Sequence, residues 1–384
     1  MIAGEASGDQ HGARVIRSLR KQHDNIAVAG AGGSAMQAAG AEIVVDIRRL
    51  SVLGFTVIFG KAYHLLNALR RLKRLISRSR PDLLILIDFP DFNLHLAGHA
   101  KKEGIPVLYY IGPQLWAWRS GRVLKIRQRV DHMAVILPFE EPFYAKSGVP
   151  VTFVGHPLMD GALHHATHLP STTASDQIGI ALLPGSREGE VKRLLPEMLK
   201  AVLLLRTDLP GIRIVISRAP TIEKELIEQI TRKYRLDGVL VSEAPVYKLF
   251  QNSHLTIVTS GTASLEAAIF GIPAILVYAV SALSYALGRL MIKVPHIGLA
   301  NLIAERRVIP ELIQEQATAA NIAARALDLL SKPEAYRKML SDLSRVRQLM
   351  GPPGASDRVA EIAGRLMADY GVKKRSSTGQ SKRG

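Results

Sequence analysis

The residues Leu83-Leu-Ile-Leu-Ile87 form an apolar run that stops at Asp88, and Phe89-Pro-Asp-Phe-Asn93 follows directly. A short apolar run bounded by a turn is typical of a strand buried in a parallel sheet. Open α/β sheets bind ligands at the carboxyl ends of such strands, so a carboxylate there can do acid or base chemistry. Taken alone, Asp88 is better explained as a helix cap or a turn residue than as a catalytic group. Other parts of the chain must decide between these two roles.

Short apolar runs alternate with helical patterns along both halves of the chain. The expected strands are 26–30, 83–87, 107–111 and 133–137 in the first half, and 178–183, 212–216, 256–259 and 274–277 in the second. This alternation predicts an α/β fold with two Rossmann-like, doubly wound parallel sheets. The predicted boundaries are a first domain at 1–160, a linker at 161–176, a second domain at 177–345, a helical segment at 346–370 and a disordered basic tail at 371–384.

The composition indicates a globular chain that works in a reducing compartment. The 384 residues include no Cys, which excludes disulfides, thiolate metal sites and a Cys nucleophile. Neither a signal peptide nor an apolar stretch long enough to span a bilayer is visible, so the cytosol is expected. His164, His165 and His168 lie in the polar linker and are better explained by solvation than by metal binding.

The net charge of +17 implies acidic partners. No zinc-finger spacing, RNA-recognition motif or helix-turn-helix signal is present, so nucleic acid is not expected. Residues 47–81 lack Asp and Glu and combine apolar with basic side chains, as does a surface that lies on an anionic membrane. The alternative is a core helix with a solvated basic face. The residues predicted to face the membrane are Phe55, Ile58, Phe59, Arg70, Arg71, Lys73 and Arg74.

The first motif, Gly4-Glu-Ala-Ser-Gly-Asp-Gln-His-Gly12, predicts a glycine-spaced loop before a helix that begins near Ala13. Such a loop presents backbone N–H groups to anionic or hydroxylated ligands. It has neither the GxGxxG spacing of NAD-binding loops nor the lysine of the Walker motif that binds ATP. The motif therefore does not indicate NAD or ATP as the ligand. Only three residues precede Gly4, so either the first strand is very short or, as we expect, the natural start lies upstream.

Two stretches of the second half each join a predicted strand to a helix in a way that suits a diphosphate. One places Gly185, Ser186 and Arg187 after a strand, and the other places Ser260, Gly261 and Thr262 at a helix start. Glu266 follows one turn later, where it can accept hydrogen bonds from sugar hydroxyls. A UDP-sugar is the ligand that fits these stretches best. Because no Asp-x-Asp pair stands at a strand end, we expect no metal and no cofactor.

Seven motifs together resemble the lipid-A-disaccharide synthase family (glycosyltransferase family 19), in matching order and spacing from Ala3 to about Leu366. The motifs are Ala3-Gly-Glu-Ala-Ser-Gly-Asp9, Asp88-Phe-Pro-Asp-Phe-Asn93, Gly112-Pro-Gln-Leu-Trp-Ala-Trp-Arg119, Leu137-Pro-Phe-Glu140, Gly155-His-Pro157, Leu183-Pro-Gly-Ser-Arg187 and Ser260-Gly-Thr-Ala-Ser-Leu-Glu266. The resemblance implies a GT-B fold with an acceptor domain first, a UDP-sugar domain second and a central cleft. It also implies that a final helix, expected at 356–369, crosses back to the first domain.

The implied reaction joins UDP-2,3-diacylglucosamine to 2,3-diacylglucosamine 1-phosphate (lipid X), at the inner face of the bacterial inner membrane. Asp88 is expected to be the general base, and Asp91 to shape its loop. The resemblance adds Asn301 to the donor site. The residues expected at the acceptor or the cleft are Glu5, Ser7, Gly8, Asp9, Gln114, Trp116, Trp118 and Arg119. The oligomeric state stays open, with a homodimer as one option.

Two other functions remain open from the sequence. Another GT-B enzyme, such as a nucleotide-sugar 2-epimerase or a different UDP-sugar transferase, would share the phosphate loops but would not explain Gln114-Leu-Trp-Ala-Trp-Arg119. A peripheral membrane-binding protein without catalysis would explain only the basic stretches, and it would not bind UDP.

Overall fold

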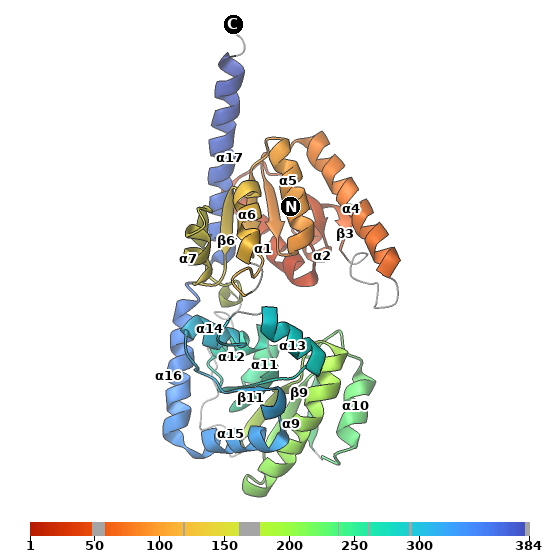
Figure 1. The fold of residues 1–384 in the computed structure, drawn as a ribbon, viewed down its shortest axis with the longest axis vertical. Coiled ribbons are helices and arrows are strands. Elements are labelled where there is room, and N and C mark those ends of the chain that lie inside the picture. The colour runs from red at the N-terminus through yellow and green to blue at the C-terminus, as the bar shows by residue number, and fades with distance from the viewer. Residues whose placement is uncertain are drawn as a thin grey trace. The chain divides into compact units, whose positions relative to one another are not determined.

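The computed structural model of the chain describes residues 1–47, 58–117, 120–160, 177–236, 238–259, 262–291 and 294–380. The chain forms two compact units (Figure 1). The first unit contains Met1–Pro157 together with Pro352–Gly384, and the second contains Leu158–Gly351. The predicted linker at 161–176 lies outside the described residues.

The first unit is built on a parallel sheet of seven strands in the order β3-β2-β1-β4-β5-β6-β7. The strands are β1 (Ile2–Ala3), β2 (Ala29–Gly32), β3 (Glu42–Asp46), β4 (Leu84–Ile87), β5 (Val107–Tyr110), β6 (His132–Val135) and β7 (Val151–Phe153). The helices are α1 (Ala6–Gln22), α2 (Ser34–Ala38), α4 (Ile58–Ser79), α5 (Pro90–Lys102), η1 (Ser120–Arg122), α6 (Val123–Arg129), α7 (Glu140–Ala145) and α17 (Ala355–Gln380).

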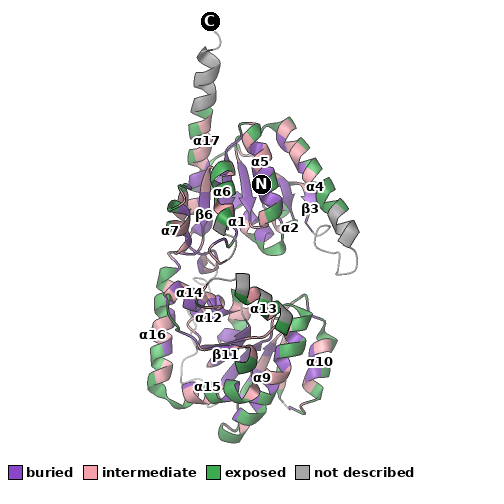
Figure 2. Cartoon of the chain, viewed as in Figure 1, coloured by how far each residue is buried: buried purple, intermediate pink, exposed green. Residues whose placement is uncertain are grey.

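Helices cover both faces of this sheet, and successive strand residues point to opposite faces. Leu84 and Leu86 pack in one core with residues of α4, α5 and α6, whereas Ile85 and Ile87 pack in another with residues of α1, α2 and α17. All four residues of β4 are buried, and Figure 2 shows the sheet strands buried between exposed helix faces. The unbroken apolar run at 83–87 is therefore explained by burial on both faces.

The second unit has a parallel sheet of six strands in the order β10-β9-β8-β11-β12-β13. The strands are β8 (Gly179–Leu183), β9 (Arg213–Ser217), β10 (Val239–Ser242), β11 (Leu255–Thr259), β12 (Ala274–Tyr278) and β13 (Glu311–Ile313). The helices are α9 (Glu188–Asp208), α10 (Lys224–Arg232), α11 (Val246–Phe250), α12 (Thr262–Phe270), α13 (Ala282–Met291), α14 (Leu299–Ala304), η2 (Gln314–Gln316), α15 (Ala319–Ser331) and α16 (Pro333–Leu349). Two doubly wound parallel sheets confirm the predicted fold class.

The last helix, α17, packs against α1 of the first unit, whereas α16 belongs to the second unit. Ser18 donates a hydrogen bond of 2.6 Å to the carboxylate of Asp357, and Arg358 Nε donates to the carbonyl of Val154. The helix continues to Gln380, ten residues past the predicted boundary at 370. Lys and Arg have high helix propensity, so the basic composition that suggested disorder also suits a continuing helix.

The start of α1 differs from the sequence prediction. The helix begins at Ala6, not near Ala13, so most of the predicted glycine loop is helical. Its glycines allow close packing: a Cβ on Gly12 would lie 2.8 Å from Met36 Sδ, and one on Gly8 would lie 3.3 Å from Ala3 Cβ. The glycines at positions 8 and 12 therefore serve the close packing of α1 on β1 and α2.

Asp9 also has a structural task. Its carboxylate is 5% exposed and accepts backbone N–H bonds from Gly33 (2.7 Å), Ala35 (3.0 Å) and Met36 (3.0 Å), at the start of α2. An acidic side chain at a helix N-terminus satisfies N–H groups that have no partner within the helix. The oxygens of Asp9 are therefore used within the fold, and its place at the acceptor or the cleft stays a prediction.

Candidate active site

Both sheets change winding direction at their centres, and the predicted site residues follow the strands at these two points. In the first sheet the change lies between β1 and β4, where Ala3 pairs with Ile87. In the second it lies between β8 and β11, where Leu183 pairs with Val258. Ligands of open α/β sheets bind at such switch points, beyond the carboxyl ends of the strands.

The strand register brings the first two motifs together in the first unit. Because Ala3 and Ile87 are partners, Gly4 and Asp88 leave adjacent strands at the same edge. Glu5, the exposed N-cap residue of α1, lies near enough to influence the carboxyl of Asp88 electrostatically. Gly4 and Asp88 are 84 residues apart in the sequence, and the parallel pairing of β1 with β4 brings them together.

Asp88 has a carboxyl that is partly withdrawn from water. Burial raises its pKa; the Phe89 backbone N–H acts in the opposite direction, and the negative charge of Glu5 raises the pKa again. Raising the pKa brings a carboxylate nearer to the basicity that proton abstraction at neutral pH requires. Asp91, by contrast, has a side chain that is 74% exposed and pairs with Arg122 at 2.5 Å. The structure therefore separates the environments of the two aspartates.

The loop that follows β5 contains the predicted residues Gln114 and Trp116. Gln114 is exposed, whereas Trp116 donates from Nε1 to the carboxylate of Glu140 at 3.2 Å and packs edge-to-face on Phe139. Trp118 and Arg119 lie outside the described residues. Ser7 is exposed on the first turn of α1.

Glu140 organises this loop, a role that the sequence reasoning missed. Its buried carboxylate accepts backbone N–H bonds from Ile136 and Leu137 in addition to the indole of Trp116. Tyr144, on the same helix, donates its hydroxyl to the carbonyl of Pro113 at 3.0 Å. Burial raises the pKa of Glu140 to about 7, although its hydrogen bonds act to lower it. The loop of residues 112–117 is thereby fixed to the β6–α7 turn.

In the second unit, the Gly185–Arg187 turn follows β8 and leads into α9. Gly185 has φ +115°, and a Cβ there would lie 2.5 Å from Glu190 Oε2, so glycine is required. The side chain of Arg187 is 83% exposed and contacts Glu190 at 3.2 Å. Ser186 accepts a hydrogen bond at its carbonyl from Thr221. An exposed guanidinium beside a helix start is suited to a phosphate group.

The neighbouring strand, β11, leads to α12, whose first residue, Thr262, is exposed. Ser260 and Gly261 lie outside the described residues. Glu266 lies one turn further along α12, and burial raises its pKa to about 7. No described residue donates a hydrogen bond to its carboxylate.

Asn301 was predicted to lie at the donor site, which stays a prediction, and the structure shows that it makes hydrogen bonds within the second unit. Its side chain is fully buried; Nδ2 donates to the carbonyl of Ile309 and to Glu311, and Oδ1 accepts from the N–H groups of Val308 and Ile309. These bonds join α14 to the approach of β13. The polar atoms of Asn301 are thus occupied within the protein.

Two sequence comparisons match nearly the whole chain. A family model described as lipid-A-disaccharide synthetase matches residues 1–361. The lipid-A-disaccharide synthase of Syntrophus aciditrophicus (strain SB) is 44% identical over 369 residues, which cover 94% of this chain and 96% of that protein.

Solved structures of more distant proteins share the fold. UDP-GlcNAc 2-epimerase from Neisseria meningitidis, bound to UDP-GlcNAc, gives a TM-score of 0.65 at 14% identity and covers 94% of this chain and 98% of that one. MurG of Acinetobacter baumannii gives 0.60 at 14% identity, with 94% and 97% covered. At this identity the likeness shows the fold alone, and it confirms the GT-B type that the motifs implied.

We predict a pH-dependent effect of the Glu140→Gln variant on the stability of the first unit. Because the folded-state pKa is raised from its usual 4.5 to about 7, the contribution of Glu140 is fully present below pH 4.5 and is lost as the pH rises through 7. The wild type should therefore lose roughly 3 kcal/mol relative to the Gln variant between pH 4.5 and pH 8.

Urea denaturation followed by tryptophan fluorescence measures this difference, since both tryptophans, Trp116 and Trp118, belong to the first unit. All other titrating groups are shared by the two proteins and cancel in the difference. A difference that does not change with pH would contradict the assignment.

Proposed function

The chain belongs to the lipid-A-disaccharide synthetase family, and from this premise we propose that Asp88 is the general base of its sugar transfer. The enzyme is a glycosyltransferase of lipid A biosynthesis. It joins UDP-2,3-diacylglucosamine to 2,3-diacylglucosamine 1-phosphate and releases UDP and the β-1,6-linked disaccharide 1-phosphate. Family membership sets aside both the 2-epimerase and the non-catalytic membrane protein as alternatives.

The observation that carries the proposal is the position of Asp88 at the switch point of the first sheet, beside Glu5. In the proposed step, the carboxylate of Asp88 takes the proton of the acceptor's 6-hydroxyl. The 6-oxygen bonds to the anomeric carbon of the donor as the bond from that carbon to the UDP phosphate breaks. Burial and the charge of Glu5, which raise the pKa of Asp88, make it a stronger proton acceptor.

The second unit is proposed to hold UDP and to stabilise it as it leaves. Arg187 offers an exposed guanidinium, and the start of α12 at Thr262 offers the N–H groups of a first helical turn and the positive end of the helix dipole. These groups would balance the charge that develops on the diphosphate. The carboxylate oxygens of Glu266, to which no described residue donates, would accept hydrogen bonds from the ribose hydroxyls.

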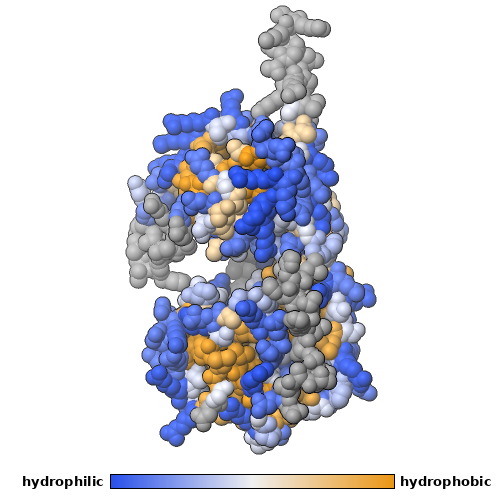
Figure 3. Space-filling view, turned by 180° about the vertical axis from the view of Figure 1, so that it is seen from behind, coloured by the Kyte–Doolittle hydropathy of each residue, from blue (hydrophilic) through white to orange (hydrophobic). Residues whose placement is uncertain are grey.

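We also propose that helix α4 holds the first unit against an anionic membrane surface. No helix among the described residues is long and apolar enough to cross a membrane. Figure 3 shows a surface on which hydrophilic areas alternate with smaller apolar patches. Tyr63, Leu65 and Leu66 of α4 are exposed large apolar residues, 65%, 39% and 51% accessible. Arg70 and Arg74 are exposed further along the same helix.

Spacing of three and four residues puts Tyr63, Leu66, Arg70 and Arg74 on one stripe of α4. The opposite stripe is buried through Ala68, Leu72 and Ile76. An apolar end that continues into a basic stripe suits insertion at a lipid interface with the cations at the phosphates. Both substrates carry acyl chains, so the enzyme would work at the inner face of the inner membrane.

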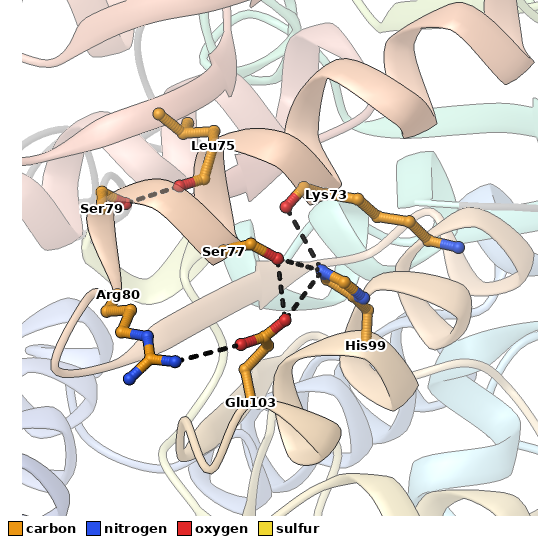
Figure 4. A network of polar contacts seen from close by, with 7 residues as sticks. All are labelled: Lys73, Leu75, Ser77, Ser79, Arg80, His99 and Glu103. Carbon is orange, nitrogen blue, oxygen red and sulfur yellow. Dashed lines mark hydrogen bonds and ion pairs between the residues drawn. The ribbon is translucent and has the colours of Figure 1, made fainter.

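A polar network fixes α4 on the body of the unit (Figure 4). Ser77 Oγ lies 2.9 Å from His99 Nε2 and donates to Glu103 at 2.8 Å, and Arg80 lies 4.0 Å from Glu103. Arg71 donates to the carbonyl of Val44. The exposed stripe is therefore held in a defined orientation. Phe55 lies outside the described residues, and Ile58 and Phe59 form the first turn of α4.

We predict that Asp88→Asn lowers kcat for acceptor-dependent UDP release by about 10²- to 10⁴-fold, the range typical of a lost general base. The affinity for UDP should be unchanged, because the amide keeps the shape of the side chain and UDP is held by the other unit. Asp91→Asn, at the exposed aspartate paired with Arg122, is the matched control and should keep kcat within a few-fold. Full turnover by Asp88→Asn would refute the assignment of the base.

The membrane proposal predicts that changing Arg70, Arg71, Lys73 and Arg74 to Glu abolishes sedimentation with vesicles that contain phosphatidylglycerol. Reversal of four basic charges replaces attraction to the anionic surface by repulsion. The control variant reverses Lys192, Lys224, Arg232 and Lys332, which are basic residues of the second unit with side chains more than half exposed. Undiminished sedimentation of the first variant, or an equal loss in the control, would contradict the proposal.

A further inference from the structure

The backbone at Asp88 adopts a conformation that its sequence does not favour. Asp88 has φ +49° and Phe89 has φ +50°, so two consecutive residues other than glycine are left-handed. In such residues the Cβ approaches the following carbonyl oxygen, and single examples are uncommon. The turn persists only because its surroundings hold it, and strain of this kind is concentrated at functional sites.

Two side chains bind the carbonyl oxygen of Asp88. Tyr109, on the neighbouring strand β5, donates its hydroxyl to this oxygen at 2.7 Å, and Asn93, on α5, donates from Nδ2 at 2.6 Å. Asn93 Nδ2 also lies 3.2 Å from the carbonyl of Ile87. Both side chains have a relative accessibility of 0%. Two donors from different elements therefore converge on one backbone atom of the proposed base.

Packing closes the other side of the turn. The ring of Phe89 lies against Gly4, where an added Cβ would be 2.2 Å from Phe89 Cγ, and it contacts Phe92 with ring centroids 5.1 Å apart. The backbone N–H of Asp88 donates to the carbonyl of Tyr110 at 3.2 Å. Since Gly4 belongs to the first motif, the turn is seated on the segment that also carries Glu5.

The hydrogen bonds of Asn93 to the turn leave one of its own polar atoms in an unfavourable environment. Selection for fold stability alone would not explain such a residue. Asn93 Oδ1 is buried and accepts no hydrogen bond from the residues that the structure describes. Buried polar atoms are nearly always paired, because leaving one unpaired loses its interaction with water without replacement. Asn93 directs its amide to the Asp88 and Ile87 carbonyls at the expense of its own oxygen.

We propose that Tyr109 and Asn93 are positioning residues for the transfer reaction, which hold Asp88 in its left-handed turn so that the carboxyl stays in place to take the acceptor's proton. This inference rests on the proposed role of Asp88 as the base. A base must lie within hydrogen-bond reach of its proton, and displacement by about 1 Å can reduce turnover 100-fold. The two donors act on the backbone and leave the carboxyl oxygens to the substrate.

The test is steady-state kinetics of Tyr109→Phe, which removes one hydroxyl and keeps the buried ring. We expect kcat to fall about 10- to 100-fold while KM for both substrates and the affinity for UDP stay within two-fold. Tyr336→Phe is the matched control, because Tyr336 also donates its hydroxyl to a backbone carbonyl, that of His254 at 2.9 Å. The control should keep its kcat. Asn93→Ala should act like Tyr109→Phe if the protein folds, and tryptophan fluorescence during urea denaturation checks folding.

A double-mutant cycle with Asp88→Asn tests the positioning role of Tyr109 separately from the role of Asp88 as the base. If Tyr109 acts through Asp88, the Tyr109→Phe change should have almost no further effect on kcat in the Asp88→Asn background. If Asp88→Asn keeps full turnover, the proposed function fails at its base. If Asp88→Asn loses turnover but Tyr109→Phe keeps its kcat, or lowers it equally in both backgrounds, the positioning role is refuted and the base assignment stands.

Discussion

The pairing of β1 with β4 is the interaction on which the site of the first unit depends. Parallel hydrogen bonding in the register Ala3–Ile87 places the turns after both strands at one edge of the sheet. Gly4 can then accept the ring of Phe89, and Glu5 can act on the carboxyl of Asp88. A slip of one residue would turn every side chain of β4 to the opposite core and would move Asp88 out of line with Gly4, so the site depends on this register.

The second sheet has a switch point of the same kind, but the side chains beyond it differ in charge from those of the first sheet. At its switch point the turn after β8 presents the exposed Arg187, and the next strand leads into the start of α12. The first unit thus offers a carboxyl with a raised pKa, and the second offers positive charge. Proton removal from a hydroxyl and departure of a diphosphate need these opposite electrostatic environments.

Strand runs and turn-bounded motifs allowed the fold class and the place of Asp88 to be predicted, because burial on both faces leaves an unbroken apolar signal. The start of α1 was predicted wrongly, since glycines that serve close packing resemble those of a ligand loop. The internal hydrogen bonds of Asp9 and Asn301 were not predicted, because polar residues in a motif carry no sign of which partners they will find. Tyr109 was missed for a related reason: it reads as one more apolar residue of a buried strand.

The central claim is that the carboxyl of Asp88 takes the proton of the acceptor. A crystal structure of the enzyme with UDP and 2,3-diacylglucosamine 1-phosphate tests this most directly. The account predicts the acceptor's 6-hydroxyl oxygen within about 3.2 Å of a carboxylate oxygen of Asp88, with the Tyr109 and Asn93 bonds to its backbone intact. A fully ordered acceptor with its 6-hydroxyl bound to another residue, such as Glu5, and out of reach of Asp88 would contradict it.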